Sequence, residues 1–157
     1  YTIVTNGDQT DTIYDGMRNG LNFEQALRSR EFEPDGPNWT PRISGLVMLD
    51  DSDRYKMSIL KSQDAEGTDC ARYTYSYRLQ NGLGHFIHTY KQNGNPIPTF
   101  EGEPERVAIP NSAEEFAEAI WNSLNEDNKI SMYVRYINVV DGSVMNRMIN
   151  KFTQVNA

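Results

Sequence analysis

Apolar and polar positions near the N-terminus predict a strand followed by a helix. Residues 1–5 carry aromatic and β-branched side chains, which favour a strand, and Asn6-Gly7 is a strong turn signal. Thr10 can cap a helix through its hydroxyl, and Gly20 suits the left-handed position that ends one. We therefore expect a helix from Thr10 to about Asn19.

A second helix is predicted to begin at Asn22, because Gln25 follows three residues later in the spacing of a capping box. Its apolar residues recur at helical spacing, which predicts that one side of the helix is buried. These residues are Phe23, Ala26 and Leu27. The stretch from Pro34 to Pro37 then ends the helical pattern in a loop.

The pattern in the middle of the chain predicts four strands, at residues 43–49, 55–60, 70–79 and 85–91. The third strand alternates most clearly. It places Tyr73, Tyr75 and Tyr77 on one face, and Arg72 and Thr74 on the other. Prolines recur between residues 96 and 110, so we expect an irregular loop there.

The C-terminal third predicts a helix and a hairpin. Ser112 and Glu115 have the spacing of a capping box, and Asp141-Gly142 is a hairpin turn between strands predicted at 130–140 and 144–152. The apolar stripe of the helix comprises Ala113, Phe116, Ala117, Ile120 and Leu124. Strands grouped between helices indicate an α+β fold with largely antiparallel sheet, and 157 residues fit a single domain.

Composition and charge disfavour several classes of function. Lys and Arg total 15 against 22 Asp and Glu, so the net charge is −7, which disfavours non-specific binding to nucleic acid. No apolar run approaches the roughly 20 residues that a membrane-spanning helix needs. Cys70 is the single cysteine, which rules out an internal disulfide framework. Because a signal-peptide pattern is also absent, we expect a cytoplasmic protein.

The residue types that commonly bind metals do not form a metal-binding pattern. His85 and His88 lie three apart on a predicted strand, where side chains alternate, so they are expected on opposite faces. Asp50, Asp51 and Asp53 resemble part of a calcium loop but lack its central glycine and distal glutamate, which favours a solvated turn. We expect no bound metal.

Two polar segments at predicted strand ends are candidates for a binding site. Residues 5–11 place short polar side chains at a helix start, where free N–H groups suit an anion or a polar ring; capping explains them equally well. Arg42 follows a proline-stiffened loop, where it can bind phosphate or carboxylate, or form an ion pair with Glu31 or Glu33. The aromatic and acidic residues of the long loop also have two interpretations: they line a slot that binds a ring, or they only pack against the protein. These residues are Tyr90, Phe100, Glu101 and Glu103.

Four short motifs follow one another along the chain. The first two are Thr5-Asn6-Gly7 with Thr10-Asp11, and Thr40-Pro41-Arg42-Ile43. The other two lie at residues 85–90 and 95–104. Together they resemble the archaeal-type IMP cyclohydrolase family and its bacterial relatives, and the last two are similar to the bacterial branch in particular. The resemblance covers nearly the whole chain.

The resemblance implies an αββα fold similar to N-terminal-nucleophile hydrolases, with two stacked, mainly antiparallel sheets flanked by helices. It also implies a cyclohydrolase that closes the ring of 5-formamidoimidazole-4-carboxamide ribotide, with loss of water, to give IMP in purine biosynthesis. No cofactor or metal is implied. Ring closure needs a base for the carboxamide nitrogen, stabilisation of the charge that develops on the formyl oxygen, and an acid for the departing hydroxyl.

The resemblance implies roles for particular residues of this sequence. Glu33 falls at the position of a catalytic glutamate, and Arg42 matches an arginine suited to phosphate or oxyanion binding. Gln9 stands where the archaeal branch often has histidine. Substrate-binding roles are implied for Asn6, Asp11, Thr40, Tyr90 and Glu101. Family members carry additional N-terminal strands, so we expect the domain of residues 1–157 to lack them, with an open edge strand and a homo-oligomer among its possible partners.

Two other functions stay open. The same fold can hold a purine nucleotide without converting it, as a binding module. It can also carry an amide hydrolase, although Tyr1 is not the Ser, Thr or Cys nucleophile that such enzymes present at their N-terminus. Fold alone does not decide among the three functions.

Overall fold

The computed structural model describes residues 1–49 and 55–152. The aspartates at 50, 51 and 53 lie outside the described residues, so the solvated turn expected there stays a prediction. The chain divides into two compact units, one of residues 1–80 and 84–107, the other of residues 81–83 and 108 onwards.

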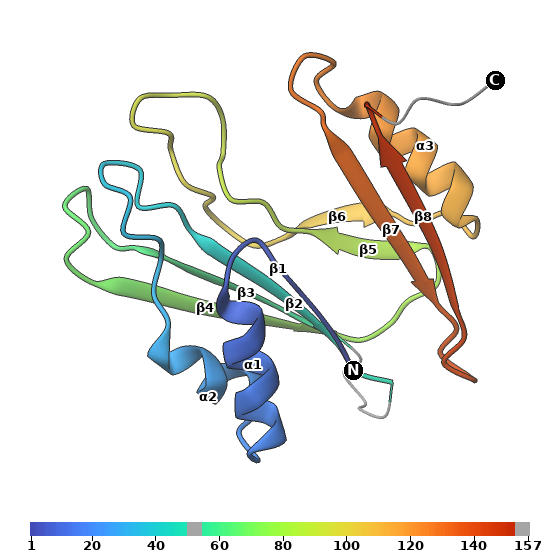
Figure 1. Cartoon of the computed structure of the whole chain (residues 1–157), viewed down its shortest axis with the longest axis horizontal. Helices are drawn as coiled ribbons and strands as arrows, with labels where there is room; N and C mark the ends of the chain where they lie inside the picture. The colour runs from blue at the N-terminus through green and yellow to red at the C-terminus, as the bar shows by residue number, and fades with distance from the viewer. Residues whose placement is uncertain (50–54, 153–157) are drawn as a thin grey trace. The chain divides into compact units, whose positions relative to one another are not determined.

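The first unit is built on a four-stranded antiparallel sheet (Figure 1). Its strands lie in chain order and are β1 (Thr2–Thr5), β2 (Arg42–Val47), β3 (Tyr55–Ser62) and β4 (Cys70–Tyr77). Arg42 pairs with Leu60, which pairs in turn with Arg72, so all three side chains point to the same face. Among the described strands β1 pairs with β2 alone, and it therefore forms an edge of the sheet.

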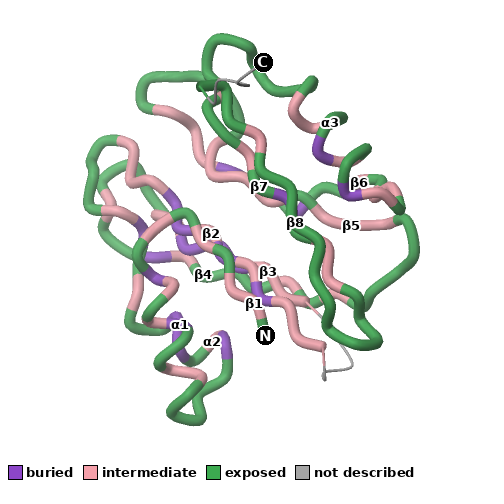
Figure 2. The backbone as a smooth tube through the Cα atoms, turned by 45° about the vertical axis from the view of Figure 1, so that its right-hand side comes forward, coloured by how far each residue is buried: buried purple, intermediate pink, exposed green. Residues whose placement is uncertain are grey.

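Two helices and a 3₁₀ turn cover one face of this sheet (Figure 1). They are α1 (Gln9–Arg18), α2 (Phe23–Ala26) and η1 (Leu27–Ser29). Buried segments of the helices and strands are purple in Figure 2. The apolar core between these layers contains Ile13, Phe23, Leu27, Phe32, Leu46, Leu60 and Cys70. The buried side predicted for the second helix is therefore confirmed.

The ends of the helices follow from local side-chain chemistry. At α2 the predicted capping box is present: Asn22 Oδ1 accepts from the Gln25 amide at 2.8 Å, and Gln25 Oε1 accepts from the Asn22 amide at 2.9 Å. At α1 the prediction that Thr10 caps the helix is wrong. The helix begins one residue earlier, after Asp8, and the Thr10 hydroxyl instead hydrogen-bonds to the hydroxyl of Thr5.

The strand predicted at residues 85–91 is also wrong in its bounds. The structure has β5 (Leu83–Phe86), which pairs with β6 (Glu105–Ala108) inside the stretch expected to be irregular. Beyond β5, the described residues form one isolated bridge across the loop, from Tyr90 to Thr99. Pro96 and Pro98 lie beside this bridge and have no N–H to donate, so a longer ladder cannot form there.

The second unit packs one helix against a hairpin. Helix α3 (Ala113–Ser123) begins after Ser112, whose hydroxyl accepts from the Glu115 amide at 3.3 Å. Strands β7 (Ser131–Ile137) and β8 (Val144–Asn150) pair antiparallel and are shorter than predicted. The buried residues between the helix and the hairpin are Ala113, Ala117 and Val134.

The α+β class and the antiparallel pairing of the sheets are thus confirmed. The stacked αββα arrangement similar to N-terminal-nucleophile hydrolases stays a prediction. Within the described ranges, no helix is long and apolar enough to cross a bilayer.

Candidate functional site

A buried arginine organises the polar cluster beside the turn between β1 and α1. Arg42 opens β2, and alternation along the strand directs it to the face that the helices cover, where only 7% of it is exposed. Its guanidinium pairs with both carboxylate oxygens of Glu33: Nη2 donates to Oε2 at 2.9 Å, and Nη1 lies 2.7 Å from Oε1. Such a two-point pair fixes the orientation of both groups.

Two side chains from the start of α1 complete the surroundings of this guanidinium. Nη1 of Arg42 donates to Gln9 Oε1 at 3.1 Å and also to Asp8 Oδ1. Gln9 is fully buried, and its Nε2 donates to the carbonyl of Ile43 at 3.0 Å, so it ties α1 to β2. Arg42 therefore joins α1, β2 and the loop that carries Glu33.

Asp8 is shared between two arginines. Its Oδ1 accepts from Arg30 as well as from Arg42, although the aspartate side chain is 71% exposed. The hydrogen bond from Arg30 and the positive charges of both arginines hold the pKa of Asp8 below its usual value, against a smaller opposing effect of burial. The carboxylate is thus kept ionised at the mouth of the cluster.

Gly7 allows the cluster to form against the backbone. A Cβ at this position would lie 2.7 Å from Arg42 Nη1, 2.8 Å from Gln9 Oε1 and 3.0 Å from Glu33 Oε1. These distances are shorter than van der Waals contact, so a larger residue would push the charged groups apart. The close approach explains a glycine in the turn, since its φ is not in the left-handed region.

Beside Arg42 lies a depression of about 440 Å³. It is lined by Asp8, Arg28, Ser29, Arg30, Glu31, Phe32 and Arg42. Three of these residues are arginines and two are carboxylates, so the depression is locally basic in a chain whose net charge is −7. Glu33 contacts Arg42 next to it, and its side chain is 34% exposed.

Asn6 lies beside this cluster, but its side-chain amide is hydrogen-bonded to other groups of the protein. Its Oδ1 accepts from the Ile43 amide at 2.9 Å and from Gln9 at 3.3 Å, and its Nδ2 donates to the Pro41 carbonyl at 2.8 Å and to Thr89 at 3.4 Å. An amide group makes about four such bonds. Asn6 therefore braces the crossing of β1 and β2, and a direct contact with substrate would break one of these bonds.

Thr40 and Tyr90 meet each other close to Glu33. The Thr40 hydroxyl is 2.6 Å from the Tyr90 hydroxyl and also bonds to Asp35, and the carbonyl of Thr40 accepts from the Glu33 amide at 2.8 Å. The segment that contains Thr40 thus fixes the backbone position of Glu33. Of the two ion pairs expected as alternatives for Arg42, the one with Glu33 forms, whereas Glu31 lies 3.6 Å from Arg72.

Two predicted residues are not brought into this cluster. Asp11 is exposed on α1, and among the described contacts its carboxylate has no bond to the group around Arg42. Glu101 pairs with Lys91 at 2.9 Å, and that hydrogen bond lowers the pKa of Glu101.

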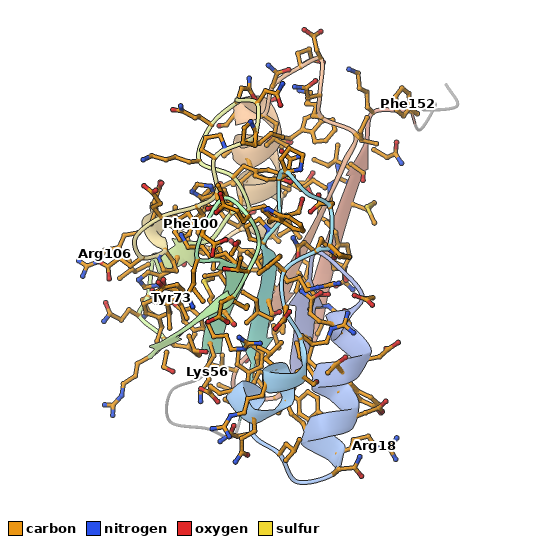
Figure 3. All side chains as sticks on the ribbon, turned by 90° about the vertical axis from the view of Figure 1, so that its left-hand side faces the viewer. Arg18, Lys56, Tyr73, Phe100, Arg106 and Phe152 are labelled. Atoms are coloured by element: carbon orange, nitrogen blue, oxygen red, sulfur yellow. The ribbon has the colours of Figure 1, made fainter. Side chains whose placement is uncertain are left out.

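Glu101 also belongs to the other face of the sheet. It lines a second depression, of about 510 Å³, together with Lys61 and Tyr73. Because Arg42 and Leu60 share a face, their neighbours Lys61 and Tyr73 point the opposite way. Figure 3 shows Tyr73 and Phe100 on the side of the sheet away from Arg18 of α1. Glu101 and Arg42 thus belong to opposite faces of the sheet, and the substrate-binding role of Glu101 stays a prediction.

Sequence reasoning missed Arg28 and Arg30 as members of this surface. Asp8 and Gln9 lie inside the polar segment of residues 5–11 that the sequence singles out, although no individual role is predicted for Asp8. Nothing local marks Arg30, because its partner Asp8 lies 22 residues away. Within residues 1–49 and 55–152, no three His, Cys, Asp or Glu side chains are grouped so that they could hold a metal ion.

Comparison with known proteins identifies a family that this chain matches. A family model described as IMP cyclohydrolase-like protein matches residues 1–142, which include the whole first unit, part of the second, and every residue of the cluster around Arg42. No curated protein and no solved structure matches the chain.

Proposed function

The chain belongs to the IMP cyclohydrolase-like protein family, and we propose that it closes the ring of 5-formamidoimidazole-4-carboxamide ribotide to form IMP. In this reaction the carboxamide nitrogen attacks the formyl carbon, a C–N bond forms, and the formyl oxygen leaves as water. The substrate class is a purine nucleotide precursor. The family match supports the class of reaction, and the arrangement of Glu33 and Arg42 supports a place for it.

The paired Glu33 and Arg42 carry the proposal. Both oxygens of Glu33 face the guanidinium, at 2.7 and 2.9 Å from its Nη atoms, yet a third of the glutamate side chain stays open to solvent. A carboxylate fixed on one side and accessible on the other can accept a proton from a bound amide. Its backbone is also held, by the bond from the Glu33 amide to the Thr40 carbonyl at 2.8 Å.

Glu33 is proposed as the general base. It takes a proton from the carboxamide nitrogen as that nitrogen attacks, and it gives this proton to the oxyanion of the tetrahedral intermediate. It then takes the proton of the former formamide nitrogen and passes it to the hydroxyl, which departs as water as the C=N bond forms. Arg42 holds Glu33 in position and places positive charge next to the oxygen on which negative charge develops. Such positioning and proton transfer are the main demands of an intramolecular ring closure, for which orientation alone can supply roughly 7–11 kcal/mol.

The other predicted binding residues have different proposed roles, because their surroundings differ. Tyr90 and Thr40 lie next to the Glu33 backbone and are proposed to contact the imidazole end of the substrate. Asn6 supports the site by bracing its two strands. A role for Asp11 is proposed on the motif alone.

The test is formation of IMP from the formylated ribotide by the purified protein and by Glu33→Gln. This substitution keeps the shape of the side chain and removes its charge. We expect turnover to fall by about 10²- to 10⁴-fold, as for loss of a general acid–base group. Glu24→Gln is the matched control, because Glu24 has a similar exposure of 38% and also forms an ion pair at 2.9 Å, with Lys56.

Three results would contradict the proposal in different ways. Full turnover by Glu33→Gln, with the circular dichroism spectrum unchanged, would remove Glu33 from the chemistry. Binding of IMP without any turnover by the unmodified protein would indicate a nucleotide-binding module. Release of formate from the substrate, in place of IMP, would indicate an amide hydrolase.

A further inference from the structure

The depression beside Arg42 contains the guanidinium of Arg28, which has no anionic partner among the residues that the structure describes. We propose that it is the subsite for a phosphate monoester, and that Arg28 and Arg30 bind the phosphate group. The identity of the rest of the ligand, a purine ribotide, rests on the proposed function. The phosphate subsite itself rests on the arginines and on the charges around them.

The charges that line the depression can be paired one by one. Asp8 is already held by Arg30 and Arg42, and Glu31 lies 3.6 Å from Arg72, which stands outside the lining. Arg28 is exposed and, within the described part of the chain, has no hydrogen bond or ion pair. One guanidinium of the lining is therefore left without an anion in a chain that carries an excess of carboxylates.

Asp8 shows that this surface can hold an anionic oxygen. Its Oδ1 accepts from two arginines that come from different elements, Arg30 after η1 and Arg42 on β2. Guanidinium groups donate to phosphate oxygens in the same way as to carboxylate oxygens. The Arg30 side chain is 24% exposed, so a phosphate can approach its guanidinium from solvent.

Arg30 is held in place for this role by its own backbone. Arg72 Nη2 donates to the Arg30 carbonyl at 2.9 Å, and the Arg30 amide donates to Leu27 at 3.1 Å. Arg28 lies in η1 two residues earlier, on the same rim. A volume of about 440 Å³ lies within the roughly 300–1,000 Å³ range of small-ligand sites, which accommodates a phosphate and the sugar attached to it.

The experiment compares three ligands by isothermal titration calorimetry: IMP, inosine and ribose 5-phosphate. IMP and inosine differ only in the phosphate, and ribose 5-phosphate lacks the base. The variants are Arg28→Gln, which removes the charge, and Arg28→Lys, which keeps it. Arg18→Gln is the control, since Arg18 is also an exposed arginine but lies at the far end of α1 (Figure 3).

We expect IMP to bind more tightly than inosine, and Arg28→Gln to weaken IMP by roughly 10-fold while inosine is unaffected. Arg28→Lys should retain most of the affinity, and Arg18→Gln should change nothing. An equal effect of Arg28→Gln on IMP and inosine, or no effect on either, would overturn the phosphate subsite. Ribose 5-phosphate binding that depends on Arg28, in a protein that forms no IMP, would keep the subsite and refute the proposed function alone.

Discussion

Gly7→Ala tests whether the position of the charged groups, and not only their presence, matters to the site. The new methyl group would lie 2.7 Å from Nη1 of Arg42, and ordinary contact begins at about 3.4 Å, so this atom has to retreat by roughly 0.7 Å. Oε1 of Gln9 and Oε1 of Glu33, at 2.8 and 3.0 Å, have to move as well. All three atoms end flexible side chains, so the backbone can stay where it is.

The expected effects on stability and on turnover differ in size. Overpacking a well-packed region costs about 1–3 kcal/mol of unfolding free energy, and the flexible ends place Gly7→Ala near the lower limit. A displacement of about 1 Å in a positioned group can reduce turnover by about 10²-fold. Since the paired groups shift by roughly 0.7 Å, we expect IMP formation to fall about 10- to 100-fold in a protein that still folds.

Gly45→Ala is the control for the substitution itself. Gly45 lies on β2 near Arg42, and among the described residues a Cβ there would meet only the Val4 carbonyl, at 3.9 Å. Urea denaturation and the IMP assay are applied to both variants, and Gly45→Ala should match the unmodified protein in turnover. Equal turnover of Gly7→Ala and Gly45→Ala, with both folded, would refute the claim that the Glu33–Arg42 geometry limits the reaction.

Two further predictions concern stability. Because the pKa of Asp8 is lowered in the folded protein, its ionised form adds stability that is complete above the unfolded pKa of about 3.9 and is lost as the pH falls through the lower folded pKa. The difference in unfolding free energy between the protein and Asp8→Asn should therefore be present at pH 7 and shrink toward pH 3, and a difference independent of pH would contradict the arginine contacts. In Gly16→Ala the new Cβ would lie 2.7 Å from the Cβ of Ala26 and 3.3 Å from its Cα, which cannot rotate away. Urea denaturation should show a net loss of about 1 kcal/mol, after the better helix propensity of alanine is subtracted, and a stabilised variant would show that α1 and α2 separate easily.

The parts of the fold that sequence predicts best depend on neighbours along the chain. The capping box of Asn22 and Gln25 joins residues three apart, and the alternation along β4 is a property of a single strand. Both patterns can be recognised from neighbouring residues, without knowing which distant segments they contact. The Asp141-Gly142 turn between β7 and β8 is a third local pattern of this type.

The site depends on contacts between distant residues, which the sequence predicts only in part. The motif identifies Arg42, but its bonds to Asp8 and Gln9 span 34 and 33 residues. Glu101 carries the right chemistry in a matching motif, yet the alternation of β3 and β4 assigns its depression to the opposite face of the sheet. A motif can therefore identify residues with suitable chemistry, but only the sheet decides which of them meet.

The burial of Arg42 itself favours a functional interpretation of the cluster. Removing a guanidinium from water is costly, and replacing a buried ion pair by apolar residues of similar volume is often neutral or stabilising. Here Nε of Arg42 is buried and has no hydrogen-bond partner among the described residues, which adds to the cost. The fold further requires glycine at position 7 so that Arg42, Gln9 and Glu33 can meet. Stability alone does not account for an arrangement with these costs, whereas a carboxylate that must be held fixed while staying accessible does.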